Sequence, residues 1–189
     1  MANVNDVASF FVDWANKSEE EHMTNLWLNK LLFFAQGQYL ARYGTPLFSD
    51  TIEAWDYGPV VPAIYRKYRV CGRNPISAVD DGYAPNKFTR DEQILLADIL
   101  REYGAYTASA LVSMTHQPNT PWSNAYVEGQ NNEITAAAME NFFRKPENKL
   151  KSFEQVFSVD NLEVIGTRDH EGYLVLPKDE DEGDDWDEL

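Results

Sequence analysis

The chain is short of positive charge. Its 189 residues include 16 Lys and Arg against 31 Asp and Glu, which gives a net charge of −15. Non-specific binding of nucleic acid depends on basic side chains that displace counterions from the phosphates. Anionic membrane surfaces also repel an acidic chain, because both carry negative charge. The composition therefore argues against nucleic acid and membranes as general partners.

Cysteine and long apolar runs are also scarce. Cys71 is the single cysteine, which excludes an internal disulfide and a zinc cluster of the Cys-rich kind. No apolar run approaches the roughly 18 residues of a membrane-spanning helix, and the first residues lack the pattern of a signal peptide. We therefore expect a cytoplasmic protein. A chain of this length buries roughly 70% of its unfolded surface, so one domain can form without a metal or disulfide.

Recognisable catalytic motifs are missing as well. The three histidines lie in different segments, outside any zinc-protease, nucleophile-elbow or phosphate-loop pattern. Cys71 precedes Gly72 and is typical of a half-buried side chain, whereas His116 is expected to cap a helix C-terminus. Glu53 and Asp56 could pair in an enzyme of unknown reaction, which remains an alternative. We predict no catalytic residue, no metal and no cofactor. The histidines are His22, His116 and His170.

Apolar residues at helical spacing predict about six helices. Thr24 is a candidate N-cap for the second helix, and Gly44 supplies its left-handed stop. This helix is apolar on nearly every side, which indicates a central and buried position. Thr89 and Glu92 have the spacing of a capping box at the start of the fourth. The predicted helices span residues 5–16, 24–43, 62–72, 89–103, 107–116 and 135–145.

Strand patterns are few and short. Residues 51–55 could form one strand, which Gly58 and Pro59 would end. Residues 162–165 and 173–176 are expected to form a hairpin around a loop at 168–172, and because an isolated hairpin is only marginally stable it must pack on another element. The predicted fold class is mainly α with minor β, a single helical domain. Its expected divisions are a helical domain at 1–146, the hairpin extension at 147–178 and an acidic disordered tail at 179–189.

About half of the net charge lies in the last eleven residues. Residues 179–189 include eight acidic side chains and no basic one, which leaves −7 on the rest of the chain. Like charges at this density predict an extended, disordered segment. Two interpretations stay open, a solubilising terminus and an acidic peptide that docks on a basic partner surface through Trp186.

An aromatic cluster surrounds the segment 58–62. Its members either wedge this loop onto the helices or stay exposed as anchors for another protein. The adjoining helix is the most basic stretch of the chain, which indicates a solvated face unless its basic residues form a local patch that touches DNA. The aromatic residues are Trp55, Tyr57, Tyr65 and Tyr68, and the basic ones are Arg66, Lys67, Arg69 and Arg73.

The order of several segments resembles the Panacea antitoxin domain family, the SocA-like proteins often labelled phage-associated GepA proteins. The resemblance covers about residues 5–144. The segments that carry it are Lys30-Leu31-Leu32-Phe33-Phe34-Ala35-Gln36-Gly37-Gln38-Tyr39-Leu40-Ala41, Pro46-Leu47-Phe48, Ile52-Glu53-Ala54-Trp55-Asp56-Tyr57-Gly58-Pro59-Val60-Val61-Pro62-Ala63-Ile64-Tyr65, Tyr103-Gly104-Ala105-Tyr106-Thr107-Ala108, Thr115-His116 and Pro121-Trp122.

The resemblance implies a mostly helical antitoxin, without catalytic residues, that binds and neutralises a cognate protein toxin. It also implies that such a domain can be matched to unrelated toxins and can deliver its toxin to a protease. Many toxins carry basic sites, which suit an acidic partner. A phage-encoded inhibitor of a host nuclease that mimics nucleic acid with its carboxylates is the alternative. The candidate partner-binding residues are Trp55, Asp56, Tyr57, Tyr65 and Trp186.

Overall fold

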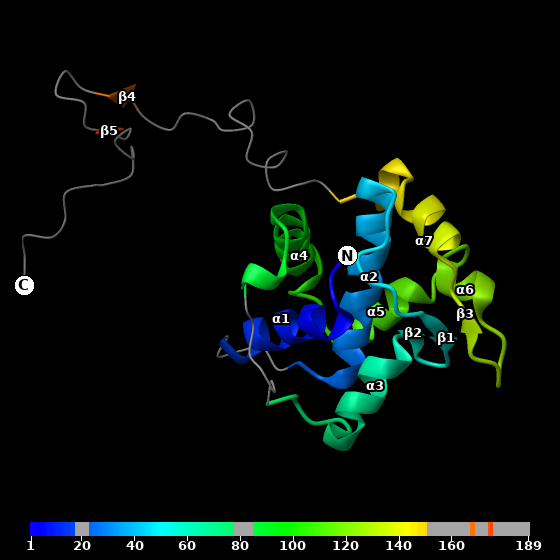
Figure 1. Cartoon of the computed structure of the whole chain (residues 1–189). Coiled ribbons are helices and arrows are strands. Elements are labelled where there is room, and N and C mark those ends of the chain that lie inside the picture. Colours follow the sequence, from blue (N-terminus) through cyan, green and yellow to red (C-terminus); the bar gives the residue numbers. More distant parts are fainter. Residues whose placement is uncertain (18–22, 78–84, 151–166, 169–173, 176–189) are drawn as a thin grey trace, which may run out of the picture. The chain divides into compact units, whose positions relative to one another are not determined.

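The computed structural model describes residues 1–17, 23–77, 85–150, 167–168 and 174–175. The chain divides into two compact units, Met1–Ser152 and Phe153–Leu189. Most of the described residues belong to the first unit, which is mainly α-helical with a small antiparallel sheet (Figure 1), so the predicted fold class is confirmed. Its elements are α1 (Val4–Lys17), α2 (Asn25–Tyr43), β1 (Glu53–Trp55), β2 (Gly58–Val60), α3 (Pro62–Tyr68), α4 (Arg90–Tyr103), α5 (Ala108–Thr115), α6 (Pro121–Ala125), β3 (Asn132–Glu133) and α7 (Ala136–Phe143), with 3-10 turns at Arg69–Cys71, Pro85–Lys87 and Pro146–Asn148.

Helix α2 forms the centre of this unit and contacts α1, α3, α4, α5, α7 and β2 (Figure 1). Its ends are those that the sequence predicts. The Thr24 hydroxyl accepts a hydrogen bond from the Trp27 amide at 3.2 Å, and Gly44 ends the helix with φ 70°. Residues on all faces of α2 are buried, which confirms the predicted central position.

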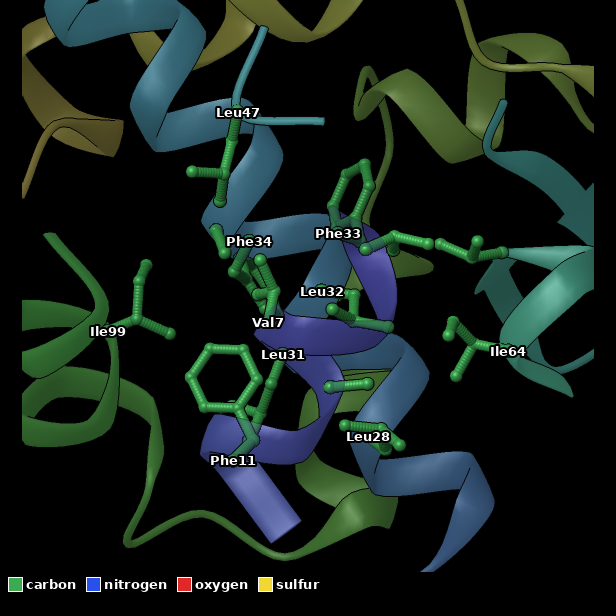
Figure 2. Close-up of a cluster of buried hydrophobic side chains, with 14 of the residues drawn as sticks. Val7, Phe11, Leu28, Leu31, Leu32, Phe33, Phe34, Leu47, Ile64 and Ile99 are labelled. Atoms are coloured by element: carbon green, nitrogen blue, oxygen red, sulfur yellow. The ribbon is translucent and has the colours of Figure 1, made fainter. Parts of the chain in front are cut away.

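The hydrophobic core gathers around α2. Val7 and Phe11 from α1, Ile64 from α3 and Ile99 from α4 point toward the leucines and phenylalanines of the central helix (Figure 2). On the opposite side α7 approaches closely at Gly37, where a Cβ atom would overlap the Phe143 ring. The core therefore requires a glycine at this contact between two helices.

Five polar side chains of α2 are buried, and each bonds the backbone of another segment, Asn25 by donating from Nδ2 to the Tyr65 carbonyl at 3.0 Å. Because a buried polar group without a partner costs about 1–3 kcal/mol, these bonds fix the segments that surround the helix. The Asn29 carbonyl oxygen accepts from the Val61 amide (2.9 Å), Lys30 Nζ donates to the Pro59 carbonyl (2.9 Å), Gln36 bonds the Leu47 amide and the Phe48 amide and carbonyl (2.9–3.2 Å), and Gln38 bonds the Leu150 amide and the Asn148 carbonyl (3.2 and 2.7 Å).

The small sheet differs from the predicted lone strand. β1 lies between β2 and β3, with Trp55 opposite Gly58 and Ala54 opposite Asn132. The predicted strand ends before Gly58 as expected, since β1 ends at Trp55, but Gly58 and Pro59 were not expected to form the returning strand β2 of a tight hairpin. β3 escapes sequence reasoning because its two residues are polar and lack alternation.

The predicted helices are found with small changes at their ends. The capping box of α4 is present, with the Glu92 carboxylate accepting from the Thr89 amide at 2.8 Å. The helix from Pro62 ends at Tyr68 and continues as a 3-10 turn to Cys71. The region at Pro121, which lies between two of the predicted helices, forms the short helix α6 behind the N-cap Thr120.

In the second unit the structure describes two short strands. β4 (Thr167–Arg168) pairs antiparallel with β5 (Leu174–Val175). β5 lies inside the predicted strand 173–176, whereas β4 includes Arg168, which was wrongly predicted to begin the loop. The predicted strand 162–165, His170 and the acidic segment 179–189 with Trp186 lie outside the described residues.

Candidate functional site

The hairpin of β1 and β2 borders a surface groove of about 840 Å³, here called the hairpin groove. Four of the five predicted partner-binding residues line it together: Trp55, Asp56, Tyr57 and Tyr65. The fifth, Trp186, lies outside the described residues. The groove therefore brings together side chains that the sequence grouped only by nearness along the chain.

The hairpin turn presents Asp56 and Tyr57 to solvent. Neither residue has positive φ, and the left-handed position is Gly58 with φ 98°, an arrangement typical of a type I turn followed by a bulge glycine. Tyr57 is 72% exposed at this tip. A large aromatic side chain this exposed on a tight turn is suited to contact another protein.

Trp55 and Tyr65 form the more buried part of the aromatic wall. Their rings meet edge to face with centroids 4.8 Å apart, and both side chains are half-buried. Trp55 Nε1 donates to the Glu53 carboxylate at 2.8 Å. Tyr68 is 5% exposed and belongs to the core. The members of the aromatic cluster therefore differ: Tyr68 is a core residue, whereas Tyr57 is exposed.

Helix α6 supports the hairpin from its other side. Trp122 Nε1 donates to the Trp55 carbonyl at 2.9 Å, and the Tyr126 hydroxyl donates to Asp56 Oδ1 at 3.0 Å. The rings of His116, Trp122 and Tyr126 stack in succession, at centroid distances of 3.7 and 4.6 Å. The hydrogen bond to Asp56 raises the pKa of Tyr126. Sequence reasoning missed this support, although Thr120 and Pro121 carry the signal of a helix N-terminus.

Lys30 lies beneath the hairpin and is fully buried. Its Nζ donates to the Pro59 carbonyl, and burial lowers the Lys30 pKa from 10.5 to about 7. His116 is the C-cap residue of α5 as predicted, but desolvation and nearby Lys30 lower its pKa. Its imidazole therefore favours the neutral, stacked form over a cation that complements the helix dipole.

Two arginines also line the groove. Arg69 and Arg73 are exposed, and in the described part of the chain neither forms an ion pair. Asp56 is the one carboxylate among the lining residues. The groove itself is thus locally basic within an acidic protein, which the net charge alone does not predict.

The described residues contain no group of three or more His, Cys, Asp and Glu side chains that could hold a metal ion. Cys71 is half-buried, as predicted. Among the helices that the structure describes, none is both long and apolar enough to cross a membrane.

Comparisons with known proteins identify the family of the chain. Residues 28–123 match the family model "Antitoxin SocA-like, Panacea domain", a narrower span than the predicted 5–144. The chain belongs to this family. The matched span includes the hairpin, the arginines, His116 and Trp122, and it ends before Tyr126. Antitoxin SocA of Caulobacter vibrioides (strain NA1000 / CB15N) is 35% identical over 112 residues, 53% of this chain and 58% of that relative's length. No solved structure matches the chain significantly.

Membership of the SocA-like Panacea family supports an antitoxin role. The chain spans less than two thirds of its curated relative, so the relative's activity does not transfer to it directly.

Gly58→Ala is expected to destabilise the domain by about 2 kcal/mol more than Gly72→Ala. Both glycines have positive φ, so backbone strain is common to the two variants. A Cβ at Gly58 would lie 2.7 Å from Lys30 Cε and 2.9 Å from Thr115 Oγ1, whereas Gly72 has no atom within 4 Å. Urea unfolding of both variants measures the difference, and equal losses would show that the hairpin does not rest tightly on Lys30.

Proposed function

We propose that the chain is an antitoxin that neutralises a cognate protein toxin by binding it directly through the hairpin groove. The single observation that carries this proposal is the exposed aromatic turn of the groove, which lies inside the span matched by the antitoxin family. The proposed contacts are Trp55, Asp56, Tyr57 and Tyr65. The role needs binding only, so we propose no catalytic step and no cofactor.

The geometry suits an interface centred on aromatic anchors. Tyr57 offers nearly its whole ring to a partner, and the half-buried Trp55 and Tyr65 provide a firm wall beside it. Interface aromatics of this kind often contribute about 2 kcal/mol or more each when a partner buries them. Because Trp122 and Tyr126 hold the hairpin from behind, little ordering is required on binding.

The terminal segment 179–189 supplies a second proposed contact. Its eight acidic side chains and Trp186 suit a basic surface of the toxin. Delivery of the bound toxin to a protease, which the family resemblance implies, is a further part of the proposal, with the cytoplasm as the place of action. A toxin half-life that shortens when the chain is co-expressed would support delivery.

A rescue selection tests the proposal. Genes of the native host are expressed one at a time from an inducible promoter, with and without this chain. We expect at least one gene whose product arrests growth alone but not with the chain, and we expect rescue to fail with the Trp55→Ala/Tyr57→Ala variant. If no host gene is rescued, the antitoxin proposal is wrong. If the folded double variant rescues fully, the groove is not the binding site.

Nucleic-acid mimicry is the alternative and requires carboxylates placed where phosphates would lie. The hairpin groove has one carboxylate, Asp56, and two guanidinium groups, Arg69 and Arg73. This composition favours the antitoxin. Competition separates the two: a nucleic acid should displace a mimic from its target, whereas an antitoxin should remain bound to a toxin whose active site is not a nucleic-acid groove.

A further inference from the structure

We propose that the hairpin groove binds an acidic segment of the partner protein that carries one apolar anchor residue. This inference rests on the proposed function, since it names the chemistry of the partner at the same site. It also differs from the expectation drawn from composition, namely that the acidic chain as a whole binds basic surfaces of its partner.

The charges of the groove are the first argument. Arg69 and Arg73 lie four positions apart on the 3-10 turn after α3 and the loop that follows it, and both face the groove. Neither forms an ion pair within the described residues, although the chain contains 31 carboxylates. The one lining carboxylate, Asp56, already accepts from the Tyr126 hydroxyl. These two exposed guanidinium groups favour carboxylates of a partner, because each guanidinium can bind one carboxylate in bidentate fashion.

The apolar wall is the second argument. Tyr57 is 72% exposed and Leu26 38% exposed, and both line the groove together with the arginines. Trp55 and Tyr65 complete this wall. A segment in the groove would thus meet both carboxylate-binding groups and an aromatic surface. An acidic peptide with a single aromatic or large aliphatic residue matches both features.

A nucleic acid is a poorer match for the same groove. Its phosphates would meet Arg69 and Arg73, but the rest of a polyanion would face a protein of net charge −15, which opposes long-range approach. A short acidic segment carries few charges beyond those that the arginines neutralise. The observations therefore favour a protein segment.

Labelled peptides test the inference on the full-length chain, read by fluorescence anisotropy. Three peptides of the length of residues 179–189 are compared: acidic with one central Trp, the same with Trp replaced by Ala, and an amide version with Asn and Gln for Asp and Glu. We expect the acidic Trp peptide to bind at least about tenfold more tightly than either other peptide at low salt, and its affinity to fall as salt rises.

Matched variants locate the binding. Arg69→Gln/Arg73→Gln should weaken the acidic Trp peptide about tenfold, and Tyr57→Ala should weaken it to a similar degree. Arg66→Gln/Arg90→Gln removes the same charge from exposed positions that do not line the groove, so it should change the affinity less than about threefold. Circular dichroism confirms that each variant is folded.

Four results would overturn the inference. The first is equal binding of the acidic and amide peptides or no binding of either, and the second is equal weakening by the two arginine pairs. A third is peptide binding that appears only in a full-length variant in which the acidic residues of 179–189 are changed to amides. That result would show that the chain's own terminal segment occupies the groove. Preference for a single-stranded oligonucleotide of equal length would also overturn it.

These measurements use no toxin, so they separate the two proposals. If the rescue selection finds no toxin while peptide binding follows the predicted pattern, the function fails and the groove assignment stands. If rescue succeeds and depends on Tyr57 but the acidic peptide does not bind, the function stands and the partner chemistry is wrong.

Discussion

Gly37→Ala is expected to lower the free energy of unfolding by about 2–3 kcal/mol. A helical glycine replaced by alanine ordinarily gains about 1 kcal/mol, so the expected sign is opposite to the usual one. The reason is the contact between α2 and α7, where the added methyl would overlap the ring of Phe143, which is 1% exposed. Relief requires the two helices to separate or the ring to leave its place between Phe33 and Phe34.

A double-mutant cycle isolates that contact. Phe143→Ala alone should cost about 3–5 kcal/mol because it leaves a cavity beside α2. In the Phe143→Ala background, Gly37→Ala should become neutral or stabilising by about 1 kcal/mol, since the methyl then enters empty space. Urea unfolding of the four proteins measures the cycle. If Gly37→Ala costs the same in both backgrounds, the close approach of α2 and α7 is not what requires glycine there.

The stability of the protein is expected to rise by several kcal/mol between pH 7 and pH 10 because of Lys30. Burial lowers its pKa in the folded chain to about 7 from the ordinary 10.5. Between these two values the unfolded chain keeps the proton while the folded chain has released it, so raising the pH favours folding. Below pH 7 both states hold the proton, and the contribution stays at its minimum.

Lys30→Met provides the control for this rise. Methionine keeps the length and volume of the side chain without the charge, and it gives up one hydrogen bond to the Pro59 carbonyl. We expect the variant to be the more stable protein at pH 6 and the difference to shrink or reverse by pH 9.5. Tyr103, whose pKa burial raises to about 12, affects both proteins equally and cancels in the difference. A constant difference from pH 6 to 9.5 would show that Lys30 does not release its proton on folding.

Local signals predicted the long helices well. Thr24 and Gly44 bound α2, and Thr89 with Glu92 begins α4, because capping depends on a few neighbouring residues. The buried position of α2 also followed from its composition, which leaves no polar face. The family resemblance rested on segments of α2 and of the region around the β1–β2 hairpin, among others, and was confirmed by the family match.

Elements made by distant partners were not predictable in the same way. β2 holds Gly58 and Pro59, which read as strand breakers, and it persists because Lys30 and Asn29 bond its end from α2. β3 exists through pairing with β1 about eighty residues earlier, and α6 is only five residues long. The basic character of the groove depends on the same long-range folding, which brings Arg69 and Arg73 to one groove with Trp55 and Tyr57.

The central claim, that the hairpin groove is the surface with which this SocA-like chain binds its toxin, is tested most directly by one pair of affinities. Tyr57→Ala and Tyr106→Ala each remove an exposed tyrosine ring, the first from the groove and the second from outside it. For the toxin recovered by rescue, isothermal titration should show Kd weakened about 30-fold by Tyr57→Ala and less than about threefold by Tyr106→Ala. Equal affinities of the two variants would contradict the account.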